Sequence, residues 1–163
     1  MSVTEELFRL GQAARRLNDG TDRLDRSLAE IDGALGRLML GFEFQLPRPI
    51  AEIEHTGRAG KRVIEVHYLG YLRTEPPDDA PVSFHLAVRV LKVFEGRRAD
   101  EPPGRVVPLL EAPRAIRHAS VDHLAVLVAG LADQVDEMVT HLDRRNEIAT
   151  SILATLQRDE PES

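Results

Sequence analysis

Residues 82–95 read VSFHLAVRVLKVFE, and along them apolar side chains alternate with side chains of mixed character. A period of two is typical of a β-strand, because successive side chains point to opposite faces. One face would carry Val82, Phe84, Leu86, Val88 and Val90. The other face would carry Ser83, His85, Ala87, Arg89 and Leu91. This segment predicts the strongest strand of the chain.

The alternation continues on both sides of this strand. Residues 63–73 predict a second strand, and residues 42–46 predict a third. Two prolines follow the third strand, and proline cannot donate to a strand ladder, so we expect an edge strand or a bulge there. Residues 105–110 predict a fourth strand, weakened by a proline. The connections would lie at 56–61, 74–81 and 96–104. Residues 42–110 therefore predict an antiparallel sheet of three to four strands.

The N-terminal residues change to the helical period. Apolar and small residues alternate three and four positions apart: Leu7, Leu10, Ala14, Leu17, Thr21, Leu24, Leu28, Ile31, Leu35 and Leu38. This spacing predicts one helix over residues 4–40. Asn18, Asp19 and Gly20 have the pattern of a helix stop, so we expect a bend there. The apolar face could cover the sheet or form the seam of a homodimer, and both interpretations remain open.

A second long helix is predicted over residues 113–157, beginning with a proline that suits the first helical position. It has the same spacing: Val121, Leu124, Val128, Leu131, Val135, Met138, Leu142, Ala149, Ile152 and Leu156. Arg145 is the one position that breaks the pattern. The apolar face is broad up to Val139 and narrows beyond Leu142. We therefore expect the first part to be buried and the second to protrude as a helical arm.

Together these elements predict an α+β fold in a single domain, residues 1–157, with a polar tail at 158–163. The two helices would cover the apolar face of the sheet. With four strands, the chain would return to the sheet edge where the first helix ends. The second helix would then pack antiparallel to the first.

Composition excludes several classes of protein. The chain has 163 residues, a formal net charge of −6, 42% hydrophobic residues and no cysteine, which excludes disulfides, thiolate zinc sites and iron–sulfur clusters. The acidic balance disfavours a broad surface for nucleic acid or anionic lipid. The longest apolar run, Leu124–Ala132, is shorter than the ~20 residues that cross a bilayer, and the acidic N-terminus lacks a signal pattern. We expect a cytoplasmic protein that binds neither nucleic acid nor membrane.

Motifs for phosphate loops, dinucleotides, zinc proteases and serine nucleophile elbows are absent from the sequence. The pairs His118–Asp122 and Glu137–His141 have the spacing of ordinary helix-surface pairs. Because spacing identifies no nucleophile–base pair and no metal cluster, we expect no enzymatic activity, no metal and no cofactor.

The more polar face of the sheet is the first candidate binding site. Glu65, His67 and Tyr71 share one side of their strand, and His85 and Arg89 share one side of the next. If neighbouring strands bring the two sets together, they could bind a ligand or a partner. The alternative is a solvated face with ordinary cross-strand pairs.

The start of the C-terminal helix is the second candidate. Arg114 and Arg117 lie in its first turns, where the helix dipole disfavours positive charge. Free backbone amides and two arginines could bind a phosphate or a partner's carboxylate. The alternative is that Glu111 or another acidic residue neutralises them locally.

These observations favour a non-enzymatic protein-interaction module: an adaptor, scaffold or chaperone-like subunit. It would self-associate, as a homodimer, or bind a partner protein through its heptad-patterned helices. The alternative is a small-molecule or anion-sensing regulatory domain that uses the polar sheet face or the arginines at the start of the second helix.

Overall fold

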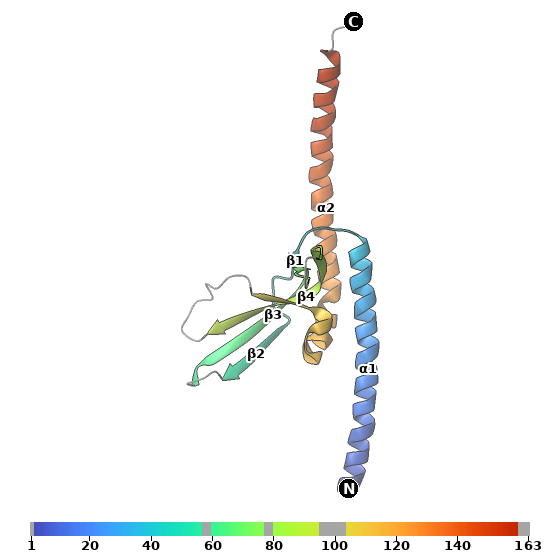
Figure 1. The fold of residues 1–163 in the computed structure, drawn as a ribbon, viewed down its shortest axis with the longest axis vertical. Helices are drawn as coiled ribbons and strands as arrows, with labels where there is room; N and C mark the ends of the chain where they lie inside the picture. Colours follow the sequence, from blue (N-terminus) through green and yellow to red (C-terminus); the bar gives the residue numbers. More distant parts are fainter. Residues whose placement is uncertain (1, 57–59, 77–79, 95–103, 160–163) are drawn as a thin grey trace. The chain divides into compact units, whose positions relative to one another are not determined.

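The computed structural model describes residues 2–56, 60–76, 80–94 and 104–159. Its elements in chain order are α1 (Val3–Arg37), β1 (Phe44–Gln45), β2 (Ala51–Thr56), β3 (Arg62–Thr74), β4 (Ser83–Phe94), β5 (Arg105–Pro108), the 3₁₀ helix η2 (Leu109–Glu111) and α2 (Arg114–Arg158) (Figure 1). All strand pairs are antiparallel, and the predicted α+β fold with a long helix at each end is confirmed. Parts of the three predicted connections and of the polar tail fall outside the described residues.

The chain divides into two compact units, Met1–Leu127 and Val128–Ser163. The first unit contains α1, the sheet, η2 and the first turns of α2. The second unit contains the remaining turns of the same helix, where most side chains are exposed. The candidate pocket described below lies within the first unit.

The helix α1 begins with a reciprocal cap. Glu5 N–H donates to Ser2 Oγ at 3.3 Å, and Ser2 N–H donates to the Glu5 carboxylate at 2.8 Å. Such a capping box satisfies two backbone donors that a helix start leaves free. The helix continues through Asn18 and Gly20 without interruption to Arg37. Gly20 therefore does not stop the helix. This agrees with the continuous apolar spacing, which predicted a single helix.

In the part of the chain that the structure describes, the sheet has five strands, whereas the sequence predicted three to four. Its order is β1-β3-β4-β5, and β2 also pairs with β3. The strand predicted at residues 42–46 is observed as β1, and Pro47 and Pro49, which have no N–H to donate to β3, separate it from β2. On either side of the two prolines the chain still bonds to β3, since Leu46 N–H donates to Leu69 O and Ile50 N–H donates to His67 O.

The strand register decides which side chains share a face. Tyr71 lies opposite Leu86 and Leu69 lies opposite Val88, so these four residues share one face of the sheet. All four are buried. The core of the first unit also contains, from the two helices and from η2, the fully buried residues Leu28, Leu109, Ile116 and Leu127.

Polar contacts join α1 to the first turns of α2. Arg114 donates to Asn18 at 3.2 Å, and Thr21 Oγ1 lies 3.1 Å from His118 Nε2. Figure 1 shows α1 and these first turns of α2, which belong to the same unit, running in the same direction. The predicted antiparallel packing of the helices differs from this arrangement. The reason is that β5 lies at the opposite edge of the sheet from β1, so the chain returns to the middle of α1 and not to its end.

Gly70 and Gly20 provide a matched test of how tightly β1 packs against β3. A Cβ added at Gly70 would lie 2.7 Å from the carbonyl oxygen of Phe44, so Gly70→Ala must push β1 away from β3. We expect this variant to lose about 1–3 kcal/mol of unfolding free energy in urea titration. Gly20→Ala, in α1 with nothing within 4 Å of its added Cβ, should instead gain up to about 1 kcal/mol. Equal stability of the two variants would contradict the tight contact between β1 and β3.

Candidate functional site

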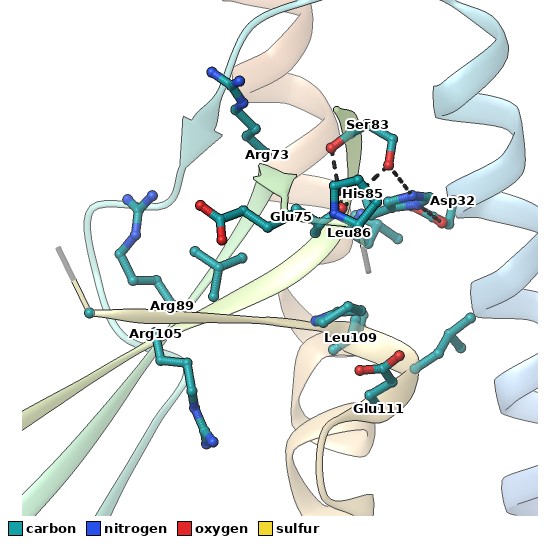
Figure 2. A pocket seen from close by; sticks show the side chains of 16 residues that line it. Asp32, Arg73, Glu75, Ser83, His85, Leu86, Arg89, Arg105, Leu109 and Glu111 are labelled. Carbon is teal, nitrogen blue, oxygen red and sulfur yellow. Dashed lines mark hydrogen bonds and ion pairs between the residues drawn. The ribbon is translucent and has the colours of Figure 1, made fainter. Parts of the chain in front are cut away.

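A groove of about 970 Å³ opens beside the sheet in the first unit (Figure 2). Its lining comes from α1, the ends of β3 and β4, β5 and η2. The polar groups that line it include Asp32, Ser83, His85, Arg89 and Arg105. A groove of this size with several convergent polar groups is the usual form of a small-molecule site.

Three of these side chains form a hydrogen-bonded relay. Ser83 Oγ lies 3.0 Å from His85 Nε2, and His85 Nδ1 lies 2.8 Å from Asp32 Oδ2. The other carboxylate oxygen, Asp32 Oδ1, accepts the backbone N–H of Leu86 at 2.7 Å. An ionised carboxylate can only accept, so in the neutral ring Nδ1 carries the proton and Nε2 accepts the hydroxyl proton of Ser83.

The geometry of β4 explains why this relay forms. Ser83 and His85 are two residues apart on one strand, so their side chains point to the same face. Pairing with β5 ends at Ala87, which lies opposite Pro108. The next residue along β4, Leu86, donates its N–H to Asp32 of α1 instead. The Asp32 carboxylate therefore accepts the N–H that a neighbouring strand would otherwise accept, and this hydrogen bond connects α1 to the sheet.

Arg89 borders the same groove but is already engaged. Its Nη1 donates to Gln45 at 2.6 Å, and its Nη2 lies 3.1 Å from a carboxylate oxygen of Glu43. Its Nε is buried, and no group in the described part of the chain accepts a hydrogen bond from it. Arg89 thus fixes the segment around β1 against β4. Because Nη1 and Nη2 are already bonded, only part of its guanidinium could bind a ligand.

The predicted polar sheet face is wrong in one respect. His67 lies opposite Val90 and Tyr71 opposite Leu86, whereas His85 lies opposite Leu72. Because opposite residues share a face, His67 and Tyr71 point to one face while His85 and Arg89 point to the other. Periodicity assigns the faces within a strand, but the relative face of two strands depends on their register.

His67 and Tyr71 lie in the interior. His67 is 2% exposed, and its Nε2 lies 2.9 Å from Glu65 Oε1 without hydrogen-bond geometry, so neither ring nitrogen has a hydrogen-bond partner among the described residues. Tyr71 stacks on Phe84 with ring centroids 6.0 Å apart. Burial raises the pKa of the Tyr71 phenol, and the negative charge of Asp32 raises it further. Among the described residues, no group of three or more acidic or histidine side chains could hold a metal ion.

The arginines at the start of α2 contact α1. Arg114 donates to Asn18, and Arg117 Nε donates to Asp25 at 2.8 Å. Arg117 also donates through Nη1 to the carbonyl oxygen of Ala112. The neutralising acid is therefore Asp25 of α1, and these contacts favour a structural role for both arginines over an anion site.

The second unit has an unusually broad apolar face. In a heptad frame with Val128 at position a, eight large apolar side chains are exposed, and each occupies an a, d, e or g position: Val128, Met138, Val139, Leu142, Ile148, Ile152, Leu153 and Leu156. Seven of the eight charged residues in this stretch lie at b, c or f: Asp133, Asp136, Glu137, Asp143, Arg144, Glu147 and Arg158. The eighth, Arg145, lies at d. We call these a, d, e and g positions of residues 128–158 the α2 face.

The helix α1 has a second exposed apolar stretch. Leu7, Leu10 and Leu17 are exposed, whereas Thr21 and Leu28, which continue the same spacing, are buried. The apolar face of α1 thus has a solvent-exposed N-terminal half and a half that contributes to the core. The buried residues match the interpretation of this helix as a cover of the sheet, and the homodimer seam stays a prediction for the exposed N-terminal half.

Of the helices in the described part of the chain, α2 alone is long and apolar enough to qualify as a membrane span on length and composition. Core helices of water-soluble proteins also qualify, so this is weak support for a membrane.

A comparison with models of protein families, with curated proteins and with solved structures found no match for this chain. Sequence reasoning did not identify Asp32 as part of the groove. The one signal in the sequence was that Asp32 directly follows Ile31, so it borders the apolar face of the predicted helix.

Proposed function

We propose that the chain is a protein-interaction module, of the adaptor, scaffold or chaperone-like type, that self-associates through the α2 face. The observation that carries this proposal is the set of exposed apolar side chains at a, d, e and g positions between Val128 and Leu156. Leaving eight large apolar side chains exposed to water along one side of a helix is unfavourable, and clusters of exposed apolar side chains mark interaction sites.

The width of the α2 face favours a helical partner. A two-stranded coiled coil buries mainly a and d and places charged residues at e and g. Here the e and g positions include Val139, Ile148 and Leu153, which carry no charge. An apolar face that includes e and g can contact two neighbouring helices at once, so it suits a bundle of helices more than a single pair.

A second copy of this chain is the partner that the residues support best. Acidic residues and arginines lie on the opposite side of the helix, so identical faces can approach without like-charge repulsion except at Arg145. A single helix has no core of its own in which to bury these side chains, and packing supplies most helix stability in proteins. Association of copies provides that burial for every protomer.

The anion-sensing alternative has less support. Arg117 is paired with Asp25, Arg114 with Asn18, and Arg89 with Gln45 and Glu43. An incoming phosphate would have to compete with each of these bonds. The described contacts therefore do not favour it as a second function.

Size-exclusion chromatography with light scattering tests the proposal directly. We expect a mass that is a multiple of 18.2 kDa and that falls on dilution. A strict monomer at the highest soluble concentration would overturn the proposal. Co-flotation with neutral lipid vesicles by a protein that is monomeric without them would also overturn it, because the α2 face would then contact lipid.

A further inference from the structure

We propose that Ser83 is an activated serine, which accepts an acyl group from a small polar ester bound in the groove. This inference is independent of the proposed self-association, because Ser83, His85 and Asp32 all lie in the first unit. It rests on the relay of these three side chains and on its position in the groove wall (Figure 2).

The arrangement has the geometry required for nucleophile activation. A serine hydroxyl is a weak nucleophile until a base within about 2.6–3.2 Å takes its proton and a third group orients that base. Ser83 Oγ lies 3.0 Å from His85 Nε2, and Asp32 holds Nδ1 at 2.8 Å. Asp32 is itself fixed by the N–H of Leu86 and is only 17% exposed in its side chain.

The chemical step balances with groups that the groove and the ester provide. Ser83 Oγ attacks the carbonyl carbon of the ester, and its proton passes to His85 Nε2. The carbon–oxygen bond to the leaving alcohol then breaks, and His85 returns the proton to that oxygen. The products are an acylated Ser83 and a free alcohol, with His85 neutral again.

The relay includes no donor for the oxyanion that forms during attack, and rapid turnover needs such donors. The proposal is therefore confined to acylation of Ser83. The substrate class follows from the groove charges: Arg73 and Arg105 are balanced by Glu75 and Glu111, so neither sign dominates. A polar, uncharged ester suits this lining better than an anionic or an apolar one.

Labelling with a biotin-tagged fluorophosphonate tests the proposal, because this probe reacts covalently with activated serines. The intact protein is incubated with the probe, and the labelled peptide is identified by mass spectrometry. We expect one adduct at Ser83, absent from Ser83→Ala, and slower labelling of His85→Ala by about 100-fold or more. Added imidazole should partly restore labelling of His85→Ala at the same serine, which a merely structural role of His85 would not produce.

Ser27 is the matched control, since it is exposed on α1 and its hydroxyl donates to the carbonyl oxygen of Arg23, and no hydrogen bond joins it to a histidine among the described residues. Ser27→Ala should leave the labelling unchanged. Asp32→Asn, which keeps an oxygen to accept the N–H of Leu86, should slow labelling at least about tenfold while circular dichroism stays the same. Labelling of Ser83 no faster than that of Ser27, or labelling unaffected by loss of His85, would overturn the proposal. Acylation of Ser83 by p-nitrophenyl acetate, seen as a mass increase, would extend it to a neutral ester.

Discussion

Replacing Asp32 with alanine is expected to lower the free energy of unfolding by about 2–3 kcal/mol. The carboxylate accepts two hydrogen bonds, at 2.7 Å from Leu86 N–H and at 2.8 Å from His85 Nδ1. Without it, the N–H of buried Leu86 has no acceptor at the end of the β5 pairing. An unsatisfied buried donor costs its full desolvation penalty, which exceeds the net gain of an average hydrogen bond.

Urea unfolding followed by circular dichroism measures this loss. Asp22 is a suitable control because it lies on the same helix and is exposed, so Asp22→Ala should change stability by less than about 0.5 kcal/mol. Asp32→Asn should lose less than Asp32→Ala, because the amide oxygen still accepts from Leu86. If Asp32→Ala and Asp22→Ala unfold at the same urea concentration, the helix α1 is not held on the sheet through this carboxylate.

Periodicity predicted the elements that depend on local pattern. The alternation in residues 82–95 corresponds to β4, and the spacing from Leu7 to Leu35 corresponds to α1. These patterns succeed because a strand or helix that buries one face must repeat its apolar residues with its own period. Gly20 shows the limit of a local stop signal, because the helix continues through it where the apolar spacing continues.

The way helices and strands pack against one another depends on long-range contacts, which the periodicity of a single segment cannot predict. The extra strand β2 arises because two prolines divide one edge segment, and both halves still pair with β3. The direction of α2 follows from the edge at which β5 pairs, a choice made by tertiary packing. The shared face of Ser83 and His85 was predictable, but Asp32 lies 53 residues away from His85 in the sequence. Only the fold brings that carboxylate to the imidazole.

The α2 face should fail as an interface when charge is introduced into it. Leu142 and Ile152 are 53% and 55% exposed and occupy a and d positions. We expect the double variant Leu142→Glu/Ile152→Glu to raise the dissociation constant of the assembly by at least about 100-fold, because it removes two apolar side chains that association buries and introduces two charges that must be desolvated. Analytical ultracentrifugation over a dilution series measures this change.

The corresponding double variant of α1, Leu7→Glu/Leu10→Glu, separates the two helices as candidates. These side chains are also exposed, at 62% and 64%, so the substitution is equally tolerable in the monomer. We expect it to leave the association unchanged. If this variant dissociates the assembly while the α2 variant does not, the interface lies on α1 and the assignment to the α2 face is wrong.

Arg145 offers the sharpest test, because it is the one charged residue at a seam position and its neighbour Arg144 lies at c. A charged side chain at d costs stability in an assembled coil while it restricts register and oligomeric order. Arg145→Leu is therefore expected to tighten self-association by about tenfold or more, whereas Arg144→Leu, the same chemical change one position away, should leave it unchanged. An effect of equal size from both variants would indicate that an added leucine strengthens association nonspecifically, whatever its position on the helix. Since only a specific helical interface distinguishes two adjacent arginines, a difference between them would identify the a, d, e and g positions as the surface that the copies share.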